Sequence, residues 1–147
     1  MSKKEIATEL FLSGCNCAQA VLGAFCEELG LERETAMKLS SSFGGGIGMM
    51  REVCGAVSGM CMVLGLARGY TPESEHSAKG EHYKLIREAV EEFRRANGSY
   101  ICRELLGVGS APESATPEKR SEAYYKKRPC AELVGIAAEI TENILMS

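Results

Sequence analysis

Fifteen consecutive residues, from Val53 to Ala67, carry no charge, and few folds can accommodate such a stretch. As a helix it is apolar all round, which is typical of a central helix buried on every side. It is shorter than the roughly 20 residues that a helix needs to cross a bilayer, so we do not expect a membrane span. Gly55 and Gly59 lie one turn apart in it. Because glycine costs about 0.5–1 kcal/mol relative to alanine inside a helix, the pair predicts that a neighbouring helix approaches closely.

The rest of the chain supplies helices that can cover this stretch. Apolar residues recur three and four positions apart, as one buried helical face requires, and no segment alternates at the period of a strand. We therefore expect an all-α fold, a single-domain helical bundle of about seven helices over residues 1–147. The helices are marked by Ile6, Leu10 and Phe11 before Gly14; by Val21 to Leu29 before Gly30; by Ala36, Leu39 and Phe43; by Gly80 to Ala96; by Tyr100 to Leu106; and by helix-opening Pro72, Pro117 and Pro129.

The charge balance is mildly acidic, with 17 Lys and Arg against 20 Asp and Glu and a net charge of −3. This argues against a protein that binds nucleic acid or an anionic membrane. The first residues hold a basic pair but no continuous apolar stretch, which does not match a secretory signal. We therefore expect a cytoplasmic protein whose seven cysteines are kept reduced. Their odd number also does not suit a closed disulfide framework.

Several common motifs are absent. No CxxC or CxxCH occurs, which excludes zinc ribbons, thioredoxin-type motifs and covalent haem attachment. The glycine run Gly44 to Gly48 lacks the Lys and Ser/Thr of a phosphate loop, and it predicts a sharp turn that brings Cys54 towards a site. His76 and His82 have no third ligand at metal spacing, so we interpret them as surface residues. The basic residues 126–128 are interpreted as a solvated helix end.

Four cysteines lie near predicted helix starts. Asn16 and Gln19 can form a capping box, which places Cys17 at the first position of its helix. Helix N-termini carry partial positive charge and lower thiol pKa values. If these starts converge, they form a site for thiolates and negative charge, which a [2Fe–2S] cluster on four thiolates would fit. The other three are Cys54 just after the glycine run, Cys102 at the third position behind Ser99, and Cys130 at the second behind Pro129.

The remaining cysteines differ in their surroundings. Cys26 and Cys61 lie in apolar helical segments, which favours small core residues over ligands. Cys15 precedes the cap of its helix, so we expect an exposed, oxidisable thiol or a resolving partner for Cys17. For the four cysteines at helix starts, spacing and capping alone support functional and structural interpretations equally.

The order of these motifs resembles a known family. The matching blocks are Asn16-Cys17-Ala18-Gln19, Phe43-Gly44-Gly45-Gly46, Cys54-Gly55-Ala56-Val57-Ser58-Gly59, Cys102-Arg103-Glu104-Leu105 and Cys130-Ala131-Glu132-Leu133-Val134. They resemble the redox-active protein family with a CGAxxG motif and four characteristic cysteines, C_GCAxxG_C_C. The likeness runs from about Gly14 to Ala138.

This resemblance implies a redox role for Cys17, Cys54, Cys102 and Cys130. A similar cysteine pattern occurs in split-Soret cytochromes beside an iron–sulfur centre, which supports a cluster, while their haem part has no counterpart here. The sequence departs from the family pattern at Cys15, Cys26 and Cys61. These extra thiols leave alternative ligands or a disulfide open.

The leading hypothesis is therefore electron transfer or redox sensing through four thiolates that bind an iron–sulfur cluster as cofactor, with no haem and no nucleotide. The alternatives are a cluster-free thiol–disulfide or metal-thiolate protein, and a helical partner-binding module with structural cysteines. The chain has no general acid–base pair or paired nucleophile, hence no motif for substrate turnover. The expected partner is a redox protein, and a homo-oligomer is compatible with the sequence.

Overall fold

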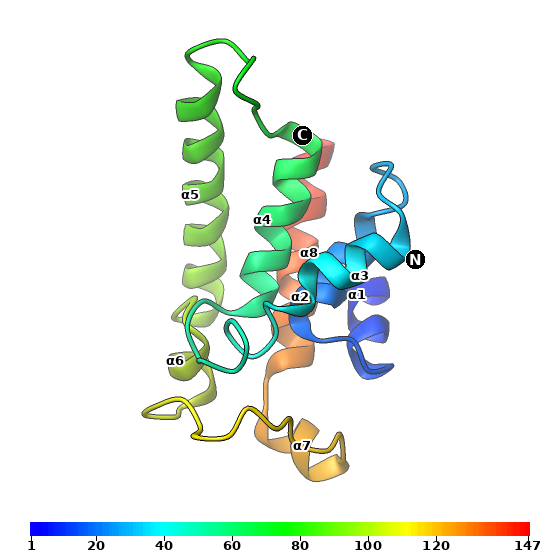
Figure 1. The fold of residues 1–147 in the computed structure, drawn as a ribbon, viewed down its shortest axis with the longest axis vertical. Coiled ribbons are helices and arrows are strands. Elements are labelled where there is room, and N and C mark those ends of the chain that lie inside the picture. Colours follow the sequence, from blue (N-terminus) through cyan, green and yellow to red (C-terminus); the bar gives the residue numbers. More distant parts are fainter.

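Eight α-helices and no β-strand make up the chain, and the computed structural model describes all 147 residues. The prediction of an all-α bundle is confirmed, with one helix more than the expected seven. The helices are α1 (Lys3–Leu12), α2 (Cys17–Phe25), α3 (Arg33–Ser41), α4 (Gly55–Arg68), α5 (Ala78–Asn97), α6 (Cys102–Leu106), α7 (Glu122–Lys127) and α8 (Cys130–Met146) (Figure 1).

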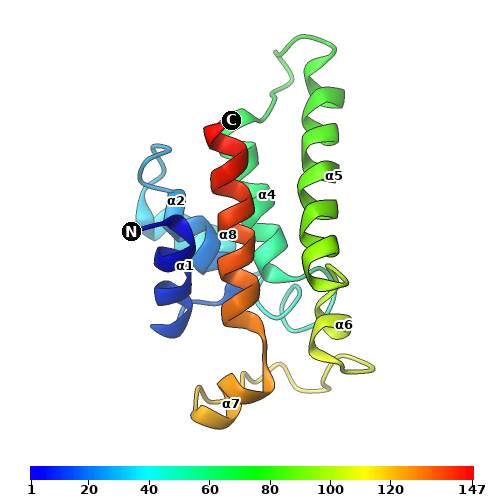
Figure 2. The ribbon, with the colours of Figure 1, turned by 180° about the vertical axis from the view of Figure 1, so that it is seen from behind.

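The apolar stretch forms α4, which runs through the middle of the molecule. α8 packs along one side of it, α2 crosses its first turns, and α5 lies on a further side (Figures 1 and 2). These helices share one core that includes the buried side chains of Leu22, Met60, Phe93 and Val134. The last turns of α4 are not covered all round as predicted, because Leu66 is 43% exposed. Each of the eight helices is too short or too polar to cross a membrane.

Short polar side chains fix where the first two helices begin. The Ser2 hydroxyl accepts a hydrogen bond from the Glu5 N–H, and the Glu5 carboxylate accepts one from the Ser2 N–H. Asn16 and Gln19 form the same capping box at α2, with both bonds at 2.9 Å. Each box satisfies backbone N–H groups that a helix leaves free at its start. The predicted capping of α2 is therefore confirmed.

The second and third helices differ from the prediction. α2 ends at Phe25, because the following residues tighten into turns and Gly30 adopts a left-handed φ of 81°. α3 buries Ala36 and Ser40, whereas Leu39 is 56% exposed. The predicted buried face is wrong at Leu39 because this short helix packs against α2 along a narrow stripe.

Of the three prolines that were predicted to open helices, two do not. No helix begins at Pro72, because the Ser74 hydroxyl accepts a hydrogen bond from the Thr71 N–H and closes a local turn instead. Residues 116–121 are not helical either, and α7 begins only behind its cap, Ser121. The segment from α6 to α8 is therefore mostly loop, with one short helix in it.

Gly55 and Gly59 of α4 face α2, as their spacing predicts. A Cβ atom on Gly59 would lie 2.8 Å from the carbonyl oxygen of Ala18, and one on Gly55 would lie 3.0 Å from the Cβ of Cys17. Both distances are shorter than van der Waals contact, so side chains here would push the helices apart. This close approach brings Cys17 next to the start of α4.

Candidate functional site

Four of the seven cysteines stand at the starts of four different helices. Cys17 is the first residue of α2, as predicted, and Cys54 directly precedes α4. Cys102 and Cys130 are the first residues of α6 and α8, rather than the third and the second. The shift at α6 arises because the Ser99 hydroxyl bonds within the preceding turn and does not cap the helix.

A short backbone pairing holds Cys54 and Cys102 beside each other. The Cys54 N–H donates to the carbonyl of Tyr100 at 2.9 Å, and the Cys102 N–H donates to that of Glu52 at 2.6 Å. The two bonds flank an isolated antiparallel bridge between residues 53 and 101. The segments that precede α4 and α6 are thereby joined, although they are far apart in the sequence. The helical pattern of the sequence gives no sign of this pairing.

The segment between α3 and α4 reverses through a left-handed turn. Every residue from Gly45 to Met49, and Arg51 after it, has a φ between 52° and 72°. Glycine adopts a positive φ readily, which explains why Gly45, Gly46 and Gly48 occupy this turn. Gly46 has a second reason, because a Cβ there would lie 2.7 Å from the Cβ of Cys102. The glycine run thus forms the sharp turn that was predicted and carries the backbone against the cysteines.

All four of these cysteines line one cavity of about 50 Å³. The cavity lies at the end of the molecule where α4 and α8 begin (Figure 1). Cys54, Cys102 and Cys130 are at most 9% exposed, and Cys17 is half-buried. Pockets for small organic molecules usually measure roughly 300–1,000 Å³, so this cavity suits an ion or an inorganic group better.

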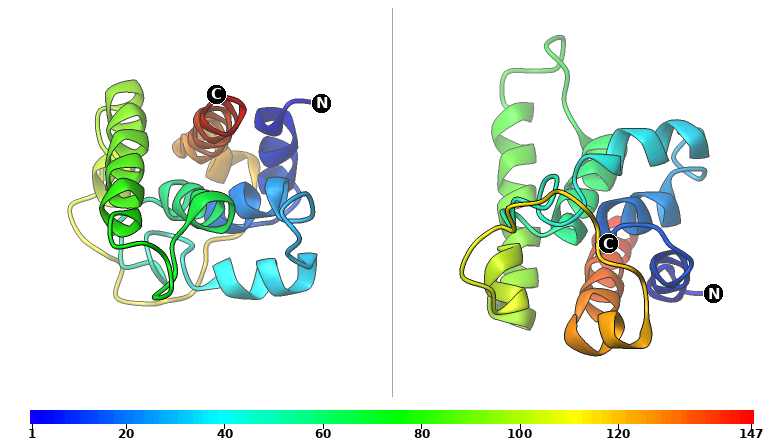
Figure 3. Two further views of the ribbon diagram at one scale, coloured as in Figure 1. Left: turned by 90° about the horizontal axis from the view of Figure 1, so that it is seen from above. Right: turned by 60° about the horizontal axis from the view of Figure 1, so that its bottom comes forward.

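Three arginines and a tyrosine line the same cavity. Arg51 is 7% exposed, and its Nη1 donates to Sγ of Cys102 at 3.7 Å. Tyr124 lies beside both Arg120 and Arg128, with ring-to-guanidinium distances of 4.9 and 4.6 Å. Arg120, Tyr124 and Arg128 come from α7 and its flanks, which lie at this end of the molecule (Figure 3, right). The arginines bring positive charge to the thiols, which favours thiolate.

The thiol pKa values depart from the prediction that helix starts lower them. Burial raises the pKa of Cys54 to about 12, against the N–H groups of the first turn of α4, and burial also raises the pKa of Cys102. Hydrogen bonding with the Cys130 thiol, together with burial, raises the pKa of Cys17. The same bond, with help from the arginines, lowers the pKa of Cys130 to about 7. The prediction is wrong for three of the four, because burial at Cys54 and Cys102, and the hydrogen bonding with Cys130 at Cys17, outweigh the effect of the helix N-terminus on the pKa.

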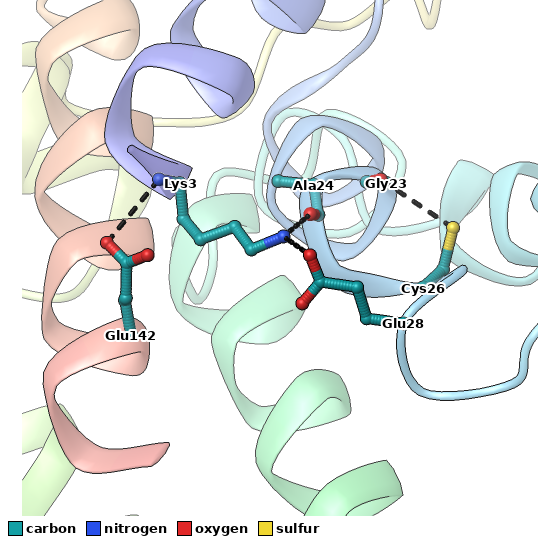
Figure 4. A network of polar contacts seen from close by, with 6 residues as sticks. All are labelled: Lys3, Gly23, Ala24, Cys26, Glu28 and Glu142. Atoms are coloured by element: carbon teal, nitrogen blue, oxygen red, sulfur yellow. Dashed lines mark hydrogen bonds and ion pairs between the residues drawn. The ribbon is translucent and has the colours of Figure 1, made fainter. Parts of the chain in front are cut away.

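Cys26 lies away from this cavity and in the core, as predicted. It is fully buried, and its Sγ donates to the carbonyl of Gly23 at 3.6 Å. Beside it, Lys3 of α1 donates to the carbonyl of Ala24 and to the carboxylate of Glu28 (Figure 4). A cation at the end of a helix satisfies carbonyls that the helix leaves free. Cys26 therefore belongs to the packing where α1 meets the end of α2.

Cys61 and Cys15 also lie outside the cavity. Cys61 is half-buried at the edge of the core, so its predicted core position holds only in part, and burial raises its pKa to about 11. Cys15 is half-buried rather than exposed, and burial raises its pKa too. Its carbonyl is the part that faces the site, since it accepts a hydrogen bond from Arg120 at 2.9 Å.

The charged and aromatic lining was missed by the sequence predictions. Lys126 and Lys127 are exposed as expected. Arg128 instead turns inward and binds Glu118 at 2.8 Å, so the prediction of a solvated helix end holds for two of the three basic residues. One feature of the sequence could have indicated Arg51: Arg51 and Glu52 are the only charged residues between residues 39 and 67. Arg120 and Tyr124 sit in a polar segment that reads as a surface helix.

No three His, Cys, Asp or Glu side chains are grouped in a way that could hold a metal ion. His76 is exposed, and the ring of half-buried His82 lies 6.1 Å from that of Tyr70, so neither reaches the cysteines. The cofactor expected at Cys17, Cys54, Cys102 and Cys130 therefore stays a prediction.

Residues 15–144 match the family model described as "Putative redox-active protein (C_GCAxxG_C_C)". The chain belongs to this family. The resemblance drawn from the CGAxxG block and its neighbouring cysteines is thus confirmed. In this C_GCAxxG_C_C protein, the CGAxxG block is the start of α4, from Cys54 to Gly59, and both of its glycines serve the contact with α2. No curated protein and no solved structure matches the chain.

Proposed function

We propose that the protein transfers or senses electrons through the thiolates of Cys17, Cys54, Cys102 and Cys130, and that these bind an iron–sulfur cluster of the [2Fe–2S] type. The observation that carries this proposal is one small cavity lined by cysteines from four helix starts, while the other three cysteines lie elsewhere. Membership of a family described by redox activity supports it.

The donor set and its charge suit such a cluster. Iron–sulfur clusters are held by cysteine thiolates, and an oxidised [2Fe–2S] cluster on four thiolates carries a net charge of about −2. Arg51, Arg120 and Arg128 supply positive charge at the same cavity. Gly46 and Gly55 hold the backbone against the cysteines, because a Cβ on either would touch Cys102 or Cys17.

When bound, the cluster would supply one-electron chemistry. The chain's own residues would control its access to water, the pH dependence of its loading and its reduction potential. Burial keeps water away from Cys54, Cys102 and Cys130. Because burial raises the pKa of Cys54 and Cys102, loading the site must release their protons, so it is favoured at higher pH. The hydrogen bond from Arg51 to Cys102 stabilises added negative charge and would raise the reduction potential.

The test is purification without air, followed by assays of iron and acid-labile sulfide and by visible absorption. We expect equal amounts of iron and sulfide and a coloured protein. A colourless protein that lacks both, even after reconstitution with iron and sulfide, would exclude the cluster.

A second candidate function follows from Cys17 and Cys130, which line the same cavity from the starts of α2 and α8, and whose interaction is the main cause that lowers the pKa of Cys130 to about 7. Two thiols in one cavity, one of them with a pKa of about 7, suit a dithiol that oxidises to a disulfide. The reaction would release two electrons and two protons to an oxidant such as a partner disulfide.

Thiol counting decides between the two candidates. The dithiol candidate predicts that cluster-free protein loses two thiols on mild oxidation, and that peptide mapping finds Cys17 linked to Cys130. An unchanged count, or a link that involves Cys15 instead, would exclude this pair.

A further inference from the structure

A second cavity of about 320 Å³ adjoins the cysteine cavity. It lies between the glycine turn after α3 and the loop that leads into α7, and the two segments run close together at this end of the molecule (Figure 3, right). Arg51, Arg120, Tyr124 and Arg128 line both cavities. Its volume is at the lower end of the range of roughly 300–1,000 Å³ for small-molecule sites.

The charge of this second cavity is strongly positive. Its charged lining consists of the guanidinium groups of Arg51, Arg120 and Arg128 and the single carboxylate of Glu118. One carboxylate oxygen of Glu118 already binds Arg128 at 2.8 Å, and its other oxygen lies 3.9 Å from Nζ of Lys127. The wall therefore holds two guanidinium groups without a carboxylate.

These two guanidinium groups are held in place although they lack an acidic partner. Arg51 is 7% exposed, and its only side-chain hydrogen bond goes to the thiol of Cys102. Arg120 donates to the carbonyls of Phe11 and Cys15, each at 2.9 Å, and lies 4.3 Å from the ring of Phe11. Burying a cation without an anion costs free energy, so a bound anion would offset that cost.

Two backbone N–H groups of the glycine turn at this cavity are without a partner. Gly44 and Gly45 line it, and their N–H groups make no hydrogen bond within the protein. Successive N–H groups on a left-handed turn point towards a common anion, as in phosphate-binding nests. Guanidinium groups likewise match the two oxygens of a carboxylate or phosphate.

We infer that this second cavity, called here the arginine cavity, binds a small molecule that carries a carboxylate or a phosphate group. The binding itself does not depend on a cluster. That the bound molecule is a substrate or effector of the neighbouring thiols rests on the proposed redox function.

The experiment is isothermal titration calorimetry on reduced, cluster-free full-length protein at fixed ionic strength, with inorganic phosphate and acetate as separate probes. We expect saturable binding of one or both probes to a single site per chain. Arg51→Met is expected to weaken it roughly ten- to a hundredfold, the value of a charge-assisted hydrogen bond. Arg51→Lys, which keeps the charge but not the fork, should fall in between.

The matched control is Arg95→Met, on the exposed face of α5 and outside this cavity. It should leave the affinity unchanged, and circular dichroism checks that each variant is folded. If Arg51→Met does not fold, Arg51→Lys still decides. The inference is overturned if neither probe binds saturably, or if wild type, Arg51→Met and Arg51→Lys bind equally well. The result is independent of iron, so it does not depend on the fate of the cluster proposal.

Discussion

Cys54 directly precedes α4 and Cys61 lies on it about two turns further along, and their surroundings differ sharply. Cys54 lines a cavity together with three other cysteines and Arg51. Cys61 lies further along α4 at the edge of the core, and burial is the only cause that raises its pKa. The start of α4 therefore holds a cysteine of the candidate site, and its middle holds a cysteine that packs.

Burial does not separate these two kinds of cysteine. Fully buried Cys26 is a core residue, whereas nearly as buried Cys54 faces the cavity. The pKa values of Cys54 and Cys61 are both raised, to about 12 and about 11. What separates the groups is convergence: the site cysteines come from four helix starts and share a cationic wall.

Removing one thiol from each region should give the largest difference between the two cysteines. Cys54→Ser is expected to abolish bound iron and labile sulfide, because a hydroxyl is a poor substitute for thiolate at iron. Cys61→Ser, on the same helix, should leave both unchanged. Iron and sulfide per chain, measured after anaerobic purification, test this. Iron retained in full by Cys54→Ser, or lost equally in both variants, would contradict the assignment.

The second prediction concerns thiol reactivity in reduced, cluster-free protein. Only the thiolate is nucleophilic, and its fraction rises with pH through the pKa. Cys130, with a pKa of about 7, is therefore half ionised near neutrality, while Cys61, at about 11, is almost fully protonated. Iodoacetamide should label Cys130 first, with a rate that levels off above pH 8. Peptide mass spectrometry measures the rate at each cysteine, and faster labelling of Cys15 or Cys61 would contradict the prediction.

Several features that depend on local sequence were predicted correctly. Capping is local, so Asn16 and Gln19 placed Cys17 at its helix start without any tertiary knowledge. The glycine spacing in α4 likewise predicted a close neighbour, although not that the neighbour is α2. The membership of the family rested on motif order, which the sequence displays directly.

The remaining features depend on pairing between distant segments. The bridge between residues 53 and 101 sets Cys54 beside Cys102, and no local pattern encodes it. Arg120 reaches the site by bonding to carbonyls at the end of α1 and before α2, which a polar loop sequence does not signal. The thiol pKa values depend on burial at the meeting point of four helices, so capping alone gave the wrong direction for three of them.

A third prediction compares two glycines of α4. Gly59→Ala places a Cβ 2.8 Å from the carbonyl oxygen of Ala18, so it should lower the free energy of unfolding by about 1–3 kcal/mol, as overpacking does. Gly65→Ala meets nothing within 4 Å and should raise that free energy by about 0.5–1 kcal/mol. Urea unfolding of the reduced, cluster-free variants measures both. A Gly59→Ala variant that is as stable as the wild type would show that the contact with α2 does not require glycine.

The capping boxes of α1 and α2 should contribute similarly to stability but differ in their effect on the thiols. Asn16→Ala and Ser2→Ala each remove a side chain that accepts a backbone N–H, so each should cost about 0.5–2 kcal/mol of stability. Their consequences for the thiols should differ, because only Asn16 lies at the cysteine cavity, where it caps the helix that starts with Cys17.

Loss of the Asn16 cap should therefore fray the first turn of α2 and weaken the hydrogen bond between Cys17 and Cys130. Because that bond is the main cause that lowers the Cys130 pKa, Asn16→Ala should move the midpoint of Cys130 alkylation to higher pH. Ser2→Ala should lower stability without moving it. Urea unfolding and the pH profile of labelling, measured on both variants, separate a local effect on the site from a general loss of stability. A shift of equal size in both variants would mean that Cys130 responds to overall stability and not to the start of α2.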